Sequence, residues 1–262
     1  MQDYGLVSII TPTWVCGQFI AETMRSVKAQ TYQNWELLIQ DDCSTDDTKD
    51  VVDKFIAENP ECQEKIKYEC NPKNSGAAIT RNNALRRAKG RWIAFLDSDD
   101  LWLPEKLEKQ LKFMVENGYK FSYTAYKEMD NDSRETGVEI HGPKHVSKFG
   151  MFAFCWPGCL TVMYNRETVG LIQIADIKKN NDYAMWLKAC RKTDCYLLDE
   201  VLAKYRRGRV GSVSTHGYGT MIRWHYKLWH EAEGMNAIAS MFWTCMNLVC
   251  GVYKKIVYVK KT

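Results

Sequence analysis

The sequence predicts an α/β fold with a mostly parallel central sheet flanked by helices, followed by a C-terminal helical appendage. Strand and helix patterns alternate at short intervals over the first hundred residues, and this alternation is typical of such a sheet. The chain has 262 residues, of which 45% are hydrophobic, so it is long enough to bury one large core. Charged residues make up 26% of the chain, and this balance excludes a disordered polypeptide or a polybasic nucleic-acid arm.

Short apolar segments mark the expected strands. The first ends at Thr11-Pro12-Thr13, and the fourth is an unbroken apolar run, as expected for a central parallel strand that is buried on both faces. In the first half, strands are expected at residues 6–10, 35–39, 66–68 and 92–96. The second half continues with a strand-like segment at residues 121–140 and a strand at residues 160–164.

Apolar residues spaced three and four apart mark the helices between these strands. A Ser/Thr/Asp cluster after the second strand caps one helix, and Pro104 opens another. Helices are expected at residues 19–30, after Asp46, at residues 77–89, after Pro104 and at residues 182–190.

Three carboxylates follow directly on the central strand, at Asp97, Asp99 and Asp100. They are therefore expected at the carboxyl edge of the sheet, where open α/β folds bind ligands. Carboxylates so crowded repel one another unless a cation intervenes, and a cluster of oxygen ligands suits Mg²⁺ or Mn²⁺ that completes its shell with diphosphate oxygens. The alternative is an acidic surface turn that binds nothing.

Two more groups of the same edge are candidates for ligand binding. Asp41 and Asp42 end the second strand, where they act either as turn and cap residues or, through one carboxylate, as the acceptor for the ring N–H of a uracil. Arg81 lies in the first turn of a helix whose N-terminus faces this edge. A cation there opposes the helix dipole, which favours a nearby carboxylate or phosphate partner over an ordinary surface arginine.

Other nucleotide-binding motifs are absent from the sequence. There is no G-x-G-x-x-G after a strand and no G-x-x-x-x-G-K-[ST], so any nucleotide is expected to be held by carboxylates and a metal. The ten cysteines form no C-x-x-C pair and are interpreted as reduced thiols, and residues 1–5 do not resemble a signal sequence. Both observations favour the cytoplasm.

The C-terminal segment differs in charge from the rest of the chain. Residues 201–262 carry a formal +8 and residues 1–200 a formal −4, within a net charge of +4. Residues 234–253 contain no charge, yet polar and apolar residues form two opposite stripes, which predicts an amphipathic helix docked on an apolar surface rather than a membrane span. We expect that surface to be one of three: an anionic membrane, the protein's own body or a second subunit. The polar stripe is Asn236, Ser240, Thr244 and Asn247; the apolar stripe is Ile238, Phe242, Cys245, Val249, Val252 and Ile256.

Four motifs follow one another in a characteristic order. They are Val7-Ser8-Ile9-Ile10-Thr11-Pro12-Thr13, Asp41-Asp42-Cys43-Ser44-Thr45-Asp46, Asn74-Ser75-Gly76-Ala77-Ala78 with Arg81-Asn82, and residues 90–96 running into Asp97-Ser98-Asp99-Asp100. This order resembles family 2 glycosyltransferases of the GT-A fold, and residues 158–163 and 182–187 extend the similarity to residue 215. The middle segment is similar to teichuronic acid, capsule and O-antigen biosynthesis glycosyltransferases.

The resemblance implies a division of the chain and a role for each matching position. Residues 1–215 would form the catalytic domain, with a nucleotide-binding half at 1–100 and an acceptor-binding half at 101–215, and residues 216–262 would form a basic amphipathic tail. The nucleotide-sugar-binding residues would be Thr11, Thr13, Asp42, Arg81, Asp97, Ser98 and Arg206; the ligands of Mn²⁺ or Mg²⁺ would be Asp99 and Asp97; and the catalytic base would be Asp182. Arg206, with Arg207 and Arg209, would close over a diphosphate or form a solvated loop. Asn181 stands where the family often has an acidic residue.

The resulting hypothesis is an inverting, metal-dependent transfer of a hexosyl unit from a UDP-sugar to the hydroxyl of a glycan carried on a polyprenyl diphosphate. The enzyme would act at the inner face of the plasma membrane and reach it through the basic tail, without binding nucleic acid; a homodimer is a further expectation. Two alternatives use a similar sheet: a nucleotide- or glycan-binding module without catalysis, and a sugar nucleotidyltransferase. The latter should have a Gly-rich phosphate loop with a basic residue after the first strand, which residues 11–17 lack.

Overall fold

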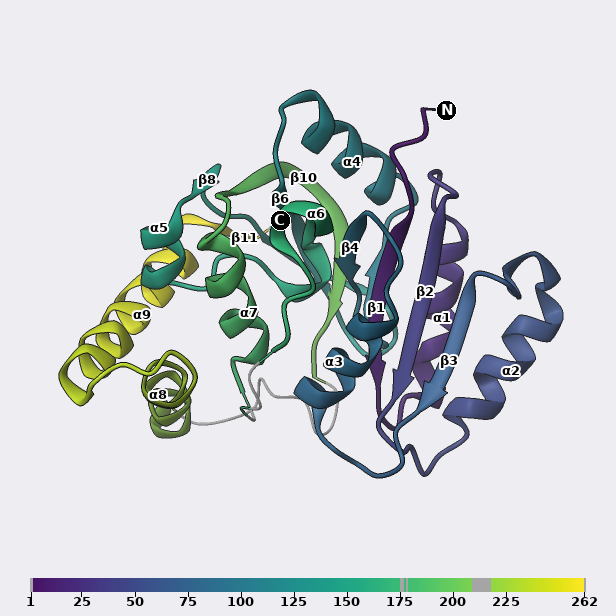
Figure 1. Ribbon diagram of the computed structural model, residues 1–262, viewed down its shortest axis with the longest axis horizontal. Helices are drawn as coiled ribbons and strands as arrows, with labels where there is room; N and C mark the ends of the chain where they lie inside the picture. Colours follow the sequence, from purple (N-terminus) through teal and green to yellow (C-terminus); the bar gives the residue numbers. More distant parts are fainter. Residues whose placement is uncertain (1, 175–176, 178, 209–217, 262) are drawn as a thin grey trace.

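Four parallel strands form the first half of the sheet, as the sequence predicts. The computed structural model describes residues 2–174, 177, 179–208 and 218–261 (Figure 1). β1 (Val7–Thr13) lies between β2 (Trp35–Asp41) and β4 (Trp92–Phe95), and β3 (Ile66–Cys70) pairs with β2 on the outside. β1 and β2 continue past their expected ends because their parallel pairing stays in register up to the pair Thr13 and Asp41.

The second half of the sheet is mainly antiparallel. β9 (Met163–Asn165) pairs antiparallel with β4, and β6 (Phe121–Met129) pairs antiparallel with both β9 and β7 (Glu135–Ile140). The parallel arrangement returns where β10 (Cys195–Arg206) runs beside β6. β5 (Leu101–Trp102) and β8 (His145–Val146) are short antiparallel partners of β10. A short connection such as that between β6 and β7 reverses the chain, whereas parallel neighbours need a long crossover.

Helices cover both faces of the sheet and enclose two apolar cores. On one face, α1 (Gly17–Lys28), α2 (Thr48–Glu58) and α4 (Lys106–Glu116) pack over residues such as Ile9. On the other face, α3 (Ala77–Arg87), α5 (Lys148–Ala153) and α7 (Asn181–Cys190) pack over residues such as Ile10. Adjacent residues of β1 enter different cores because side chains alternate across a strand. Shorter elements are η1 (Pro60–Cys62), η2 (Cys159–Thr161) and α6 (Arg166–Val169); η2 occupies the start of the strand expected at 160–164.

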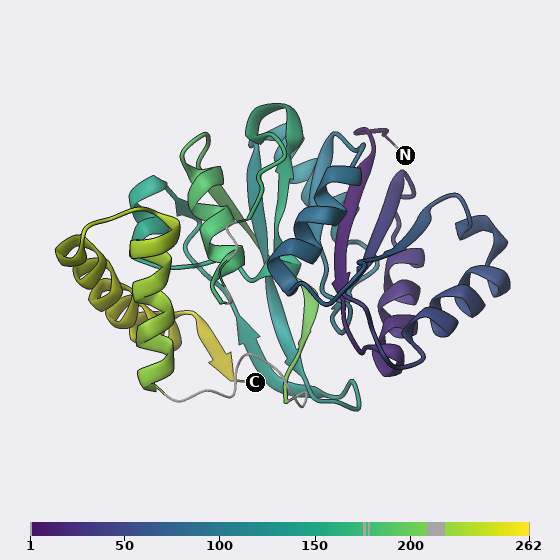
Figure 2. The same ribbon diagram turned by 60° about the horizontal axis from the view of Figure 1, so that its bottom comes forward.

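The C-terminal segment forms a helical unit that returns to the sheet. α8 (Tyr218–Lys227) continues into a π-helical turn, η4 (Leu228–Ala232), and the chain then forms α9 (Ala237–Val257) and β11 (Val259–Lys261). β11 pairs antiparallel with β7 and so attaches the tail to the sheet. Figure 2 shows α8 and α9 beside α5 and α7, at the end of the molecule opposite α2. The boundary expected at residue 215 lies outside the described residues.

The polar stripe of α9, and not its apolar stripe, faces the protein body. Ser240, Thr244 and Asn247 are all at most 2% exposed. The Asn247 amide donates to the carbonyls of Phe152, at 3.0 Å, and Ala153, at 2.7 Å, at the end of α5. These bonds explain the inverted packing, because a polar side chain is buried at little cost when its hydrogen bonds are made. Of the three surfaces that the sequence left open for the apolar stripe, the protein's own body is therefore not the one it contacts, and the stripe is exposed.

Among the described residues, no helix combines the length and the apolar character needed to cross a bilayer.

Candidate active site

The carboxyl ends of β1, β2 and β4 bring the predicted site residues to one edge of the sheet. The backbone N–H of Asp42 donates to the Thr13 carbonyl at 2.9 Å, and that of Leu96 donates to the Ile10 carbonyl at 3.1 Å. Both β2 and β4 therefore end beside β1, and Asp97, the residue after Leu96, lies at the same edge as Asp42. The sequence-based expectation that these strand ends form one site is consistent with this register.

Two threonine hydroxyls at the end of β1 are buried without a hydrogen-bond partner. Thr11 is 0% and Thr13 is 3% exposed, and neither Oγ1 atom has a partner among the described residues. Both side chains lie on the same face of the strand because they are two residues apart. A buried hydroxyl without a hydrogen bond costs free energy, so these two groups suit contact with a polar ligand such as a nucleoside.

The carboxylate of Asp42 is fixed by three donors. Its Oδ1 accepts hydrogen bonds from Asn71 Nδ2 at 2.9 Å and from the Ser75 backbone at 2.7 Å, and its Oδ2 accepts one from the Gly76 backbone at 2.8 Å. Gly76 has a φ of 86°, a conformation that favours glycine at the start of α3. Oδ2 retains acceptor capacity for an N–H such as that of uracil. Sequence reasoning did not single out Asn71, which also accepts from Gln40 and donates to Thr80.

Arg81 connects the two halves of the site. Its Nη1 donates to Asn181 Oδ1 at 2.9 Å, at the start of α7, and its Nη2 donates to Asp97 Oδ1 at 2.7 Å, just after β4. The residue is only 6% exposed. Although burial opposes its charge, the neighbouring groups of Cys159, Asp97 and Asp182 raise the pKa of Arg81 above its ordinary value. The sequence predicts a carboxylate or phosphate partner for Arg81, and the structure places the carboxylate of Asp97 there.

Asp182 lies in the first turn of α7 close to this arginine. Its Oδ1 accepts a hydrogen bond from the Tyr183 backbone at 2.8 Å. The preceding Asn180 caps the helix in the left-handed conformation, with a φ of 58°, which asparagine tolerates better than most residues. Burial raises the pKa of Asp182 above its ordinary value of 3.8, against the opposing effects of the Arg81 charge and the backbone donors. A carboxyl with a raised pKa is suited to proton transfer.

The acidic cluster after β4 divides into surface and buried members. Asp97 and Asp99 are partly exposed, whereas Ser98 and Asp100 are 4% and 1% exposed. Burial, together with the charges of Asp99 and Asp97, raises the pKa of Asp100 well above its ordinary value. Ser98 is buried and its carbonyl accepts from Thr23 Oγ1 at 2.9 Å. In the described part of the chain, no three Asp, Glu, His or Cys side chains gather to hold a metal, so Asp97 and Asp99 would bind one only together with ligand oxygens.

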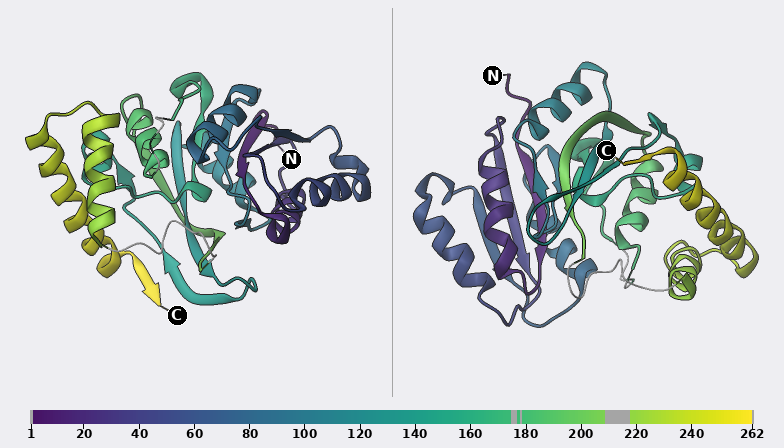
Figure 3. Two further views of the ribbon diagram at one scale, coloured as in Figure 1. Left: turned by 90° about the horizontal axis from the view of Figure 1, so that it is seen from below. Right: turned by 180° about the vertical axis from the view of Figure 1, so that it is seen from behind.

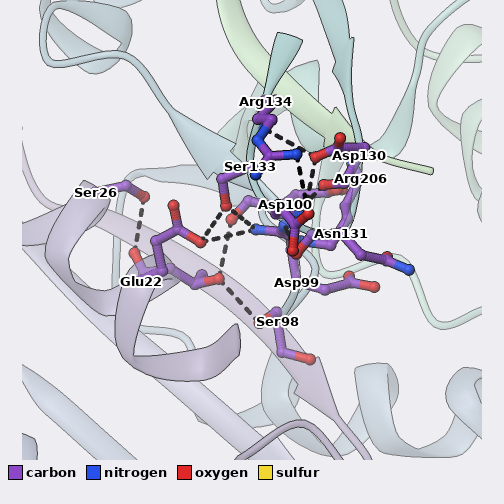
Figure 4. A network of polar contacts seen from close by, with 12 residues as sticks. Glu22, Ser26, Ser98, Asp99, Asp100, Asp130, Asn131, Ser133, Arg134 and Arg206 are labelled. Atoms are coloured by element: carbon purple, nitrogen blue, oxygen red, sulfur yellow. Dashed lines mark hydrogen bonds and ion pairs between the residues drawn. The ribbon is translucent and has the colours of Figure 1, made fainter. Parts of the chain in front are cut away.

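The guanidinium of Arg206, for which the resemblance implies nucleotide-sugar binding, is bonded within the protein. The side chain is 0% exposed, and its five N–H donors have five acceptors (Figure 4). The acceptors are the carbonyls of Asp99, Asp130 and Asn131, the hydroxyl of Ser133 and the carboxylate of Glu22. Its backbone N–H also donates to Asp100 Oδ1 at 2.8 Å. Arg206 therefore holds the loop after β4 in place, whereas Arg209 lies outside the described residues.

The same network fixes how the acidic cluster is presented. The backbone of Asp99 is bonded to Arg206, while its carboxylate points away from the arginine (Figure 4). Asp100 is turned inward toward the Arg206 backbone, and the Thr23 hydroxyl also donates to the Asp100 carbonyl at 3.0 Å. The arginine thus stabilises a turn in which Asp100 is turned inward and the Asp99 carboxylate points away from the network (Figure 4).

Comparison with known proteins identifies the family. The model of glycosyl transferase family 2 matches residues 8–166, which is more than half of the chain. The chain belongs to glycosyltransferase family 2. TuaG of Bacillus subtilis, named for teichuronic acid biosynthesis, is 43% identical to this glycosyltransferase over 202 residues, which cover 77% of this chain and 79% of TuaG.

Two relatives from Escherichia coli have names that specify a reaction. Both WfgD and WfaP are named UDP-Glc:α-D-GlcNAc-diphosphoundecaprenol β-1,3-glucosyltransferase. WfgD is 34% identical over 256 residues, covering 97% of this chain and 96% of WfgD. WfaP is 39% identical over 218 residues, covering 83% of each chain. The relatives of this glycosyltransferase thus include enzymes named for lipid-linked glycan acceptors.

Solved structures show the same GT-A type of fold. S. aureus TarS in complex with UDP-GlcNAc superposes with a TM-score of 0.66 at 20% identity, over 89% of this chain and 69% of that chain. A Pyrobaculum calidifontis mannosyltransferase in complex with GDP-Man and Mn²⁺ superposes with a TM-score of 0.65 at 16% identity, over 95% and 75% of the two chains. At this identity the similarity concerns the fold alone, and it confirms the predicted fold class.

Proposed function

We propose that this glycosyltransferase moves a hexosyl unit from a UDP-sugar to a hydroxyl of a glycan acceptor linked to a polyprenyl diphosphate, with inversion at the anomeric carbon. The observation that carries the proposal is the bridge made by Arg81. It joins Asp97, at the end of the nucleotide-side strand β4, to the start of α7, where Asp182 lies. One buried side chain thus bonds to the carboxylate at the donor edge and to Asn181, the residue that precedes the carboxyl suited to proton transfer. The names of WfgD and WfaP support the choice of donor and acceptor class.

The proposed reaction is a single displacement. The acceptor oxygen forms a bond to the anomeric carbon while the bond from that carbon to the diphosphate oxygen breaks, and the electron pair leaves with UDP. The acceptor proton passes to Asp182 late in the step, because a sugar hydroxyl is a much weaker acid than a carboxyl. Thr11, Thr13 and Asp42 hold the nucleoside, since their unpaired hydroxyls and the remaining acceptor capacity of the carboxylate lie at that edge.

Asp99 and Asp97 are the residues that would hold Mn²⁺ or Mg²⁺, which would neutralise the charge on the departing diphosphate. The partly exposed position of both carboxylates and the outward direction of Asp99 fit this role (Figure 4). One Asp97 oxygen accepts a hydrogen bond from Arg81, so Asp97 would contribute to a metal site mainly through its other oxygen. We place the reaction at the cytoplasmic face of the plasma membrane, where the reduced thiols expected from the sequence persist.

The test of the proposed function is a transfer assay with the purified full chain. The reaction contains a panel of UDP-sugars, Mn²⁺ and a water-soluble, short-chain α-D-GlcNAc diphosphate lipid as the acceptor. UDP release that depends on the acceptor, and a product whose anomeric configuration by NMR is opposite to that of the donor, are expected. Binding of UDP without release from any UDP-sugar would overturn the proposal in favour of a binding module.

Asp99→Asn is expected to weaken the Mn²⁺-dependent part of UDP binding by roughly tenfold or more, because an amide is a poorer ligand than a carboxylate for a hard cation. UDP affinity without metal should stay within about twofold of the wild type, since this change leaves the nucleoside contacts in place. Titration calorimetry with and without Mn²⁺ measures both quantities. Asp53→Asn, an exposed change on α2, is the matched control. An equal Mn²⁺ effect in the wild type and in Asp99→Asn would contradict the assignment.

The acid limb of the pH profile of kcat/KM is expected above the pH at which an ordinary aspartate titrates. Asp182 must be deprotonated to accept a proton, and its pKa is raised by burial, so activity rises as pH increases through that raised value. Asn181→Asp should shift the limb to still higher pH, because a second negative charge next to Arg81 disfavours ionised Asp182. Asn117→Asp, the same change at an exposed residue after α4, should leave the limb in place. An unshifted limb in Asn181→Asp would argue against Asp182 as the base.

A further inference from the structure

The outer face of α9 is a continuous apolar surface. Ile238, Val249 and Ile256, which recur along the whole helix, are 84%, 65% and 76% exposed. The other large apolar residues exposed on this helix are Met241, Phe242, Val252, Tyr253 and Val257. α9 lies at the edge of the molecule in both views of Figure 3, with α8 and α5 on its inner side. A run of exposed apolar side chains this long marks an interaction surface.

Polar contacts fix the helix so that this face cannot turn inward. Besides its bonds to the end of α5, Asn247 donates to the Tyr183 hydroxyl at 3.2 Å and accepts from Trp229 Nε1 at 3.3 Å. One turn from the helix end, Lys254 Nζ donates to the Trp156 carbonyl at 2.8 Å. Rotating the apolar face toward the body would break these bonds and leave the carbonyls of Phe152, Ala153 and Trp156 without these donors. The apolar face is therefore available for a partner outside the chain.

The C-terminal segment that carries this face is mainly positive. Lys255 on α9 and Lys260 and Lys261 on β11 are exposed. Residues 218–261 contain two acids, and neither is unpaired: Glu231 pairs with Lys227, and the side chain of Glu233 is 1% exposed and bonded to Arg191. A partner with negative charge complements such a surface, whereas a second copy of the same face would bring no anion to these lysines.

We propose that α9 docks the enzyme on an anionic lipid bilayer, with its apolar face at the boundary of headgroups and acyl chains and its lysines at the phosphates. A helix with one apolar face and flanking cations binds membranes in this way, in the plane of the surface. The proposal deepens the proposed function, because it supplies the surface on which a lipid-linked acceptor resides. The bond between Asn247 and Tyr183 connects the docked helix directly to α7, in which Asp182 precedes Tyr183. Docking would thus set the position of the catalytic helix relative to the lipid.

Co-sedimentation of the full chain with vesicles tests the proposal. The vesicles contain phosphatidylcholine alone or with phosphatidylglycerol. The wild type should bind the anionic vesicles, and Phe242→Gln/Val249→Gln should bind them at least about tenfold more weakly, because two exposed apolar side chains no longer enter the bilayer. Val115→Gln, a matched change at an exposed apolar residue of α4, should bind like the wild type. Lys260→Gln/Lys261→Gln should reduce the preference for phosphatidylglycerol.

Two further measurements separate the alternatives. Sedimentation velocity without lipid should give a monomer for the wild type; a dimer that Phe242→Gln/Val249→Gln dissociates would overturn the proposal in favour of a second copy. Transfer to the water-soluble acceptor should be equal in this variant and the wild type, whereas transfer to a vesicle-embedded acceptor should fall. Equal vesicle binding by both proteins would overturn the docking role. If the enzyme transfers sugar to neither acceptor, but its vesicle binding depends on Phe242 and Val249, the proposed function fails and the docking surface stands.

Discussion

Replacing Asp182 with asparagine is expected to lower kcat by roughly 10² to 10⁴, the usual contribution of a positioned general base. Asparagine has nearly the same shape, and it can still accept the hydrogen bond from the Tyr183 backbone. It cannot take up the acceptor proton, so the step that forms the glycosidic bond loses its base while the site keeps its form. UDP affinity should therefore change by less than about twofold, because the nucleoside contacts lie on β1 and β2.

Single-turnover measurements with saturating donor and acceptor distinguish this chemical defect from weaker binding. Asp194→Asn is the matched control, because Asp194 is a partly exposed aspartate that pairs with His145 just before β10 begins, away from the site. It should retain wild-type kcat. A kcat for Asp182→Asn within about threefold of the wild type, or an equal loss in both variants, would remove Asp182 from the role of base.

The edge of the sheet could be predicted because it depends on local patterns. Apolar runs ending in Thr13, Asp42 and Asp97 mark strand ends, and parallel strands bring their carboxyl ends to one edge. The prediction of a carboxylate or phosphate partner for Arg81 also followed from local physics, since a cation near the N-terminus of a helix opposes the helix dipole. The structure supplies Asp97 as that partner. The second partner, Asn181, is a hundred residues away in the chain, and no periodicity links the two positions.

Arg206 shows why the surroundings of a charged residue are hard to predict from its sequence. It lies beside Arg207 in a basic stretch next to glycine, a pattern that indicates an exposed loop. In the structure it is the last residue of β10, and its five acceptors come from α1, from the loop after β4 and from the turn between β6 and β7. Such acceptors are mostly backbone carbonyls, which leave no mark in a sequence.

α9 shows a second limit of prediction from the sequence, namely which face of a helix packs against the protein. The spacing of its polar and apolar residues predicted both the helix and its two faces, and both are present. The spacing does not say which face turns inward, and the usual rule places the apolar face there. Here the inward face is chosen by the bonds that Asn247 and Lys254 make with α5, Tyr183 and the Trp156 carbonyl. The polar face is the better match for these groups, and the apolar face is left for a partner.

Arg206→Met is expected to lower the free energy of unfolding by about 3–5 kcal/mol, as found when one partner of a buried ionic network is removed. Methionine fills part of the space but donates no hydrogen bond. Three backbone carbonyls, those of Asp99, Asp130 and Asn131, would lose their donor, and Glu22 would lose its cation. Because Asp99 is held through this bond, the turn that presents the metal-binding carboxylates should loosen as well, and the Mn²⁺-dependent part of UDP binding should weaken.

Urea unfolding and UDP calorimetry on the same variant distinguish this stabilising role from direct ligand contact. Arg134→Met is the control, because Arg134 lies next to the same network but its side chain is 77% exposed and pairs only with exposed Asp132 among the described residues. It should cost less than about 1 kcal/mol, the usual value of a surface ion pair. If Arg206→Met unfolds at wild-type urea concentrations but loses metal-free UDP affinity, Arg206 contacts the nucleotide, as the resemblance implied. If stability falls and metal-free affinity is kept, the arginine acts by holding the turn after β4, and the diphosphate must find its cations elsewhere in the site.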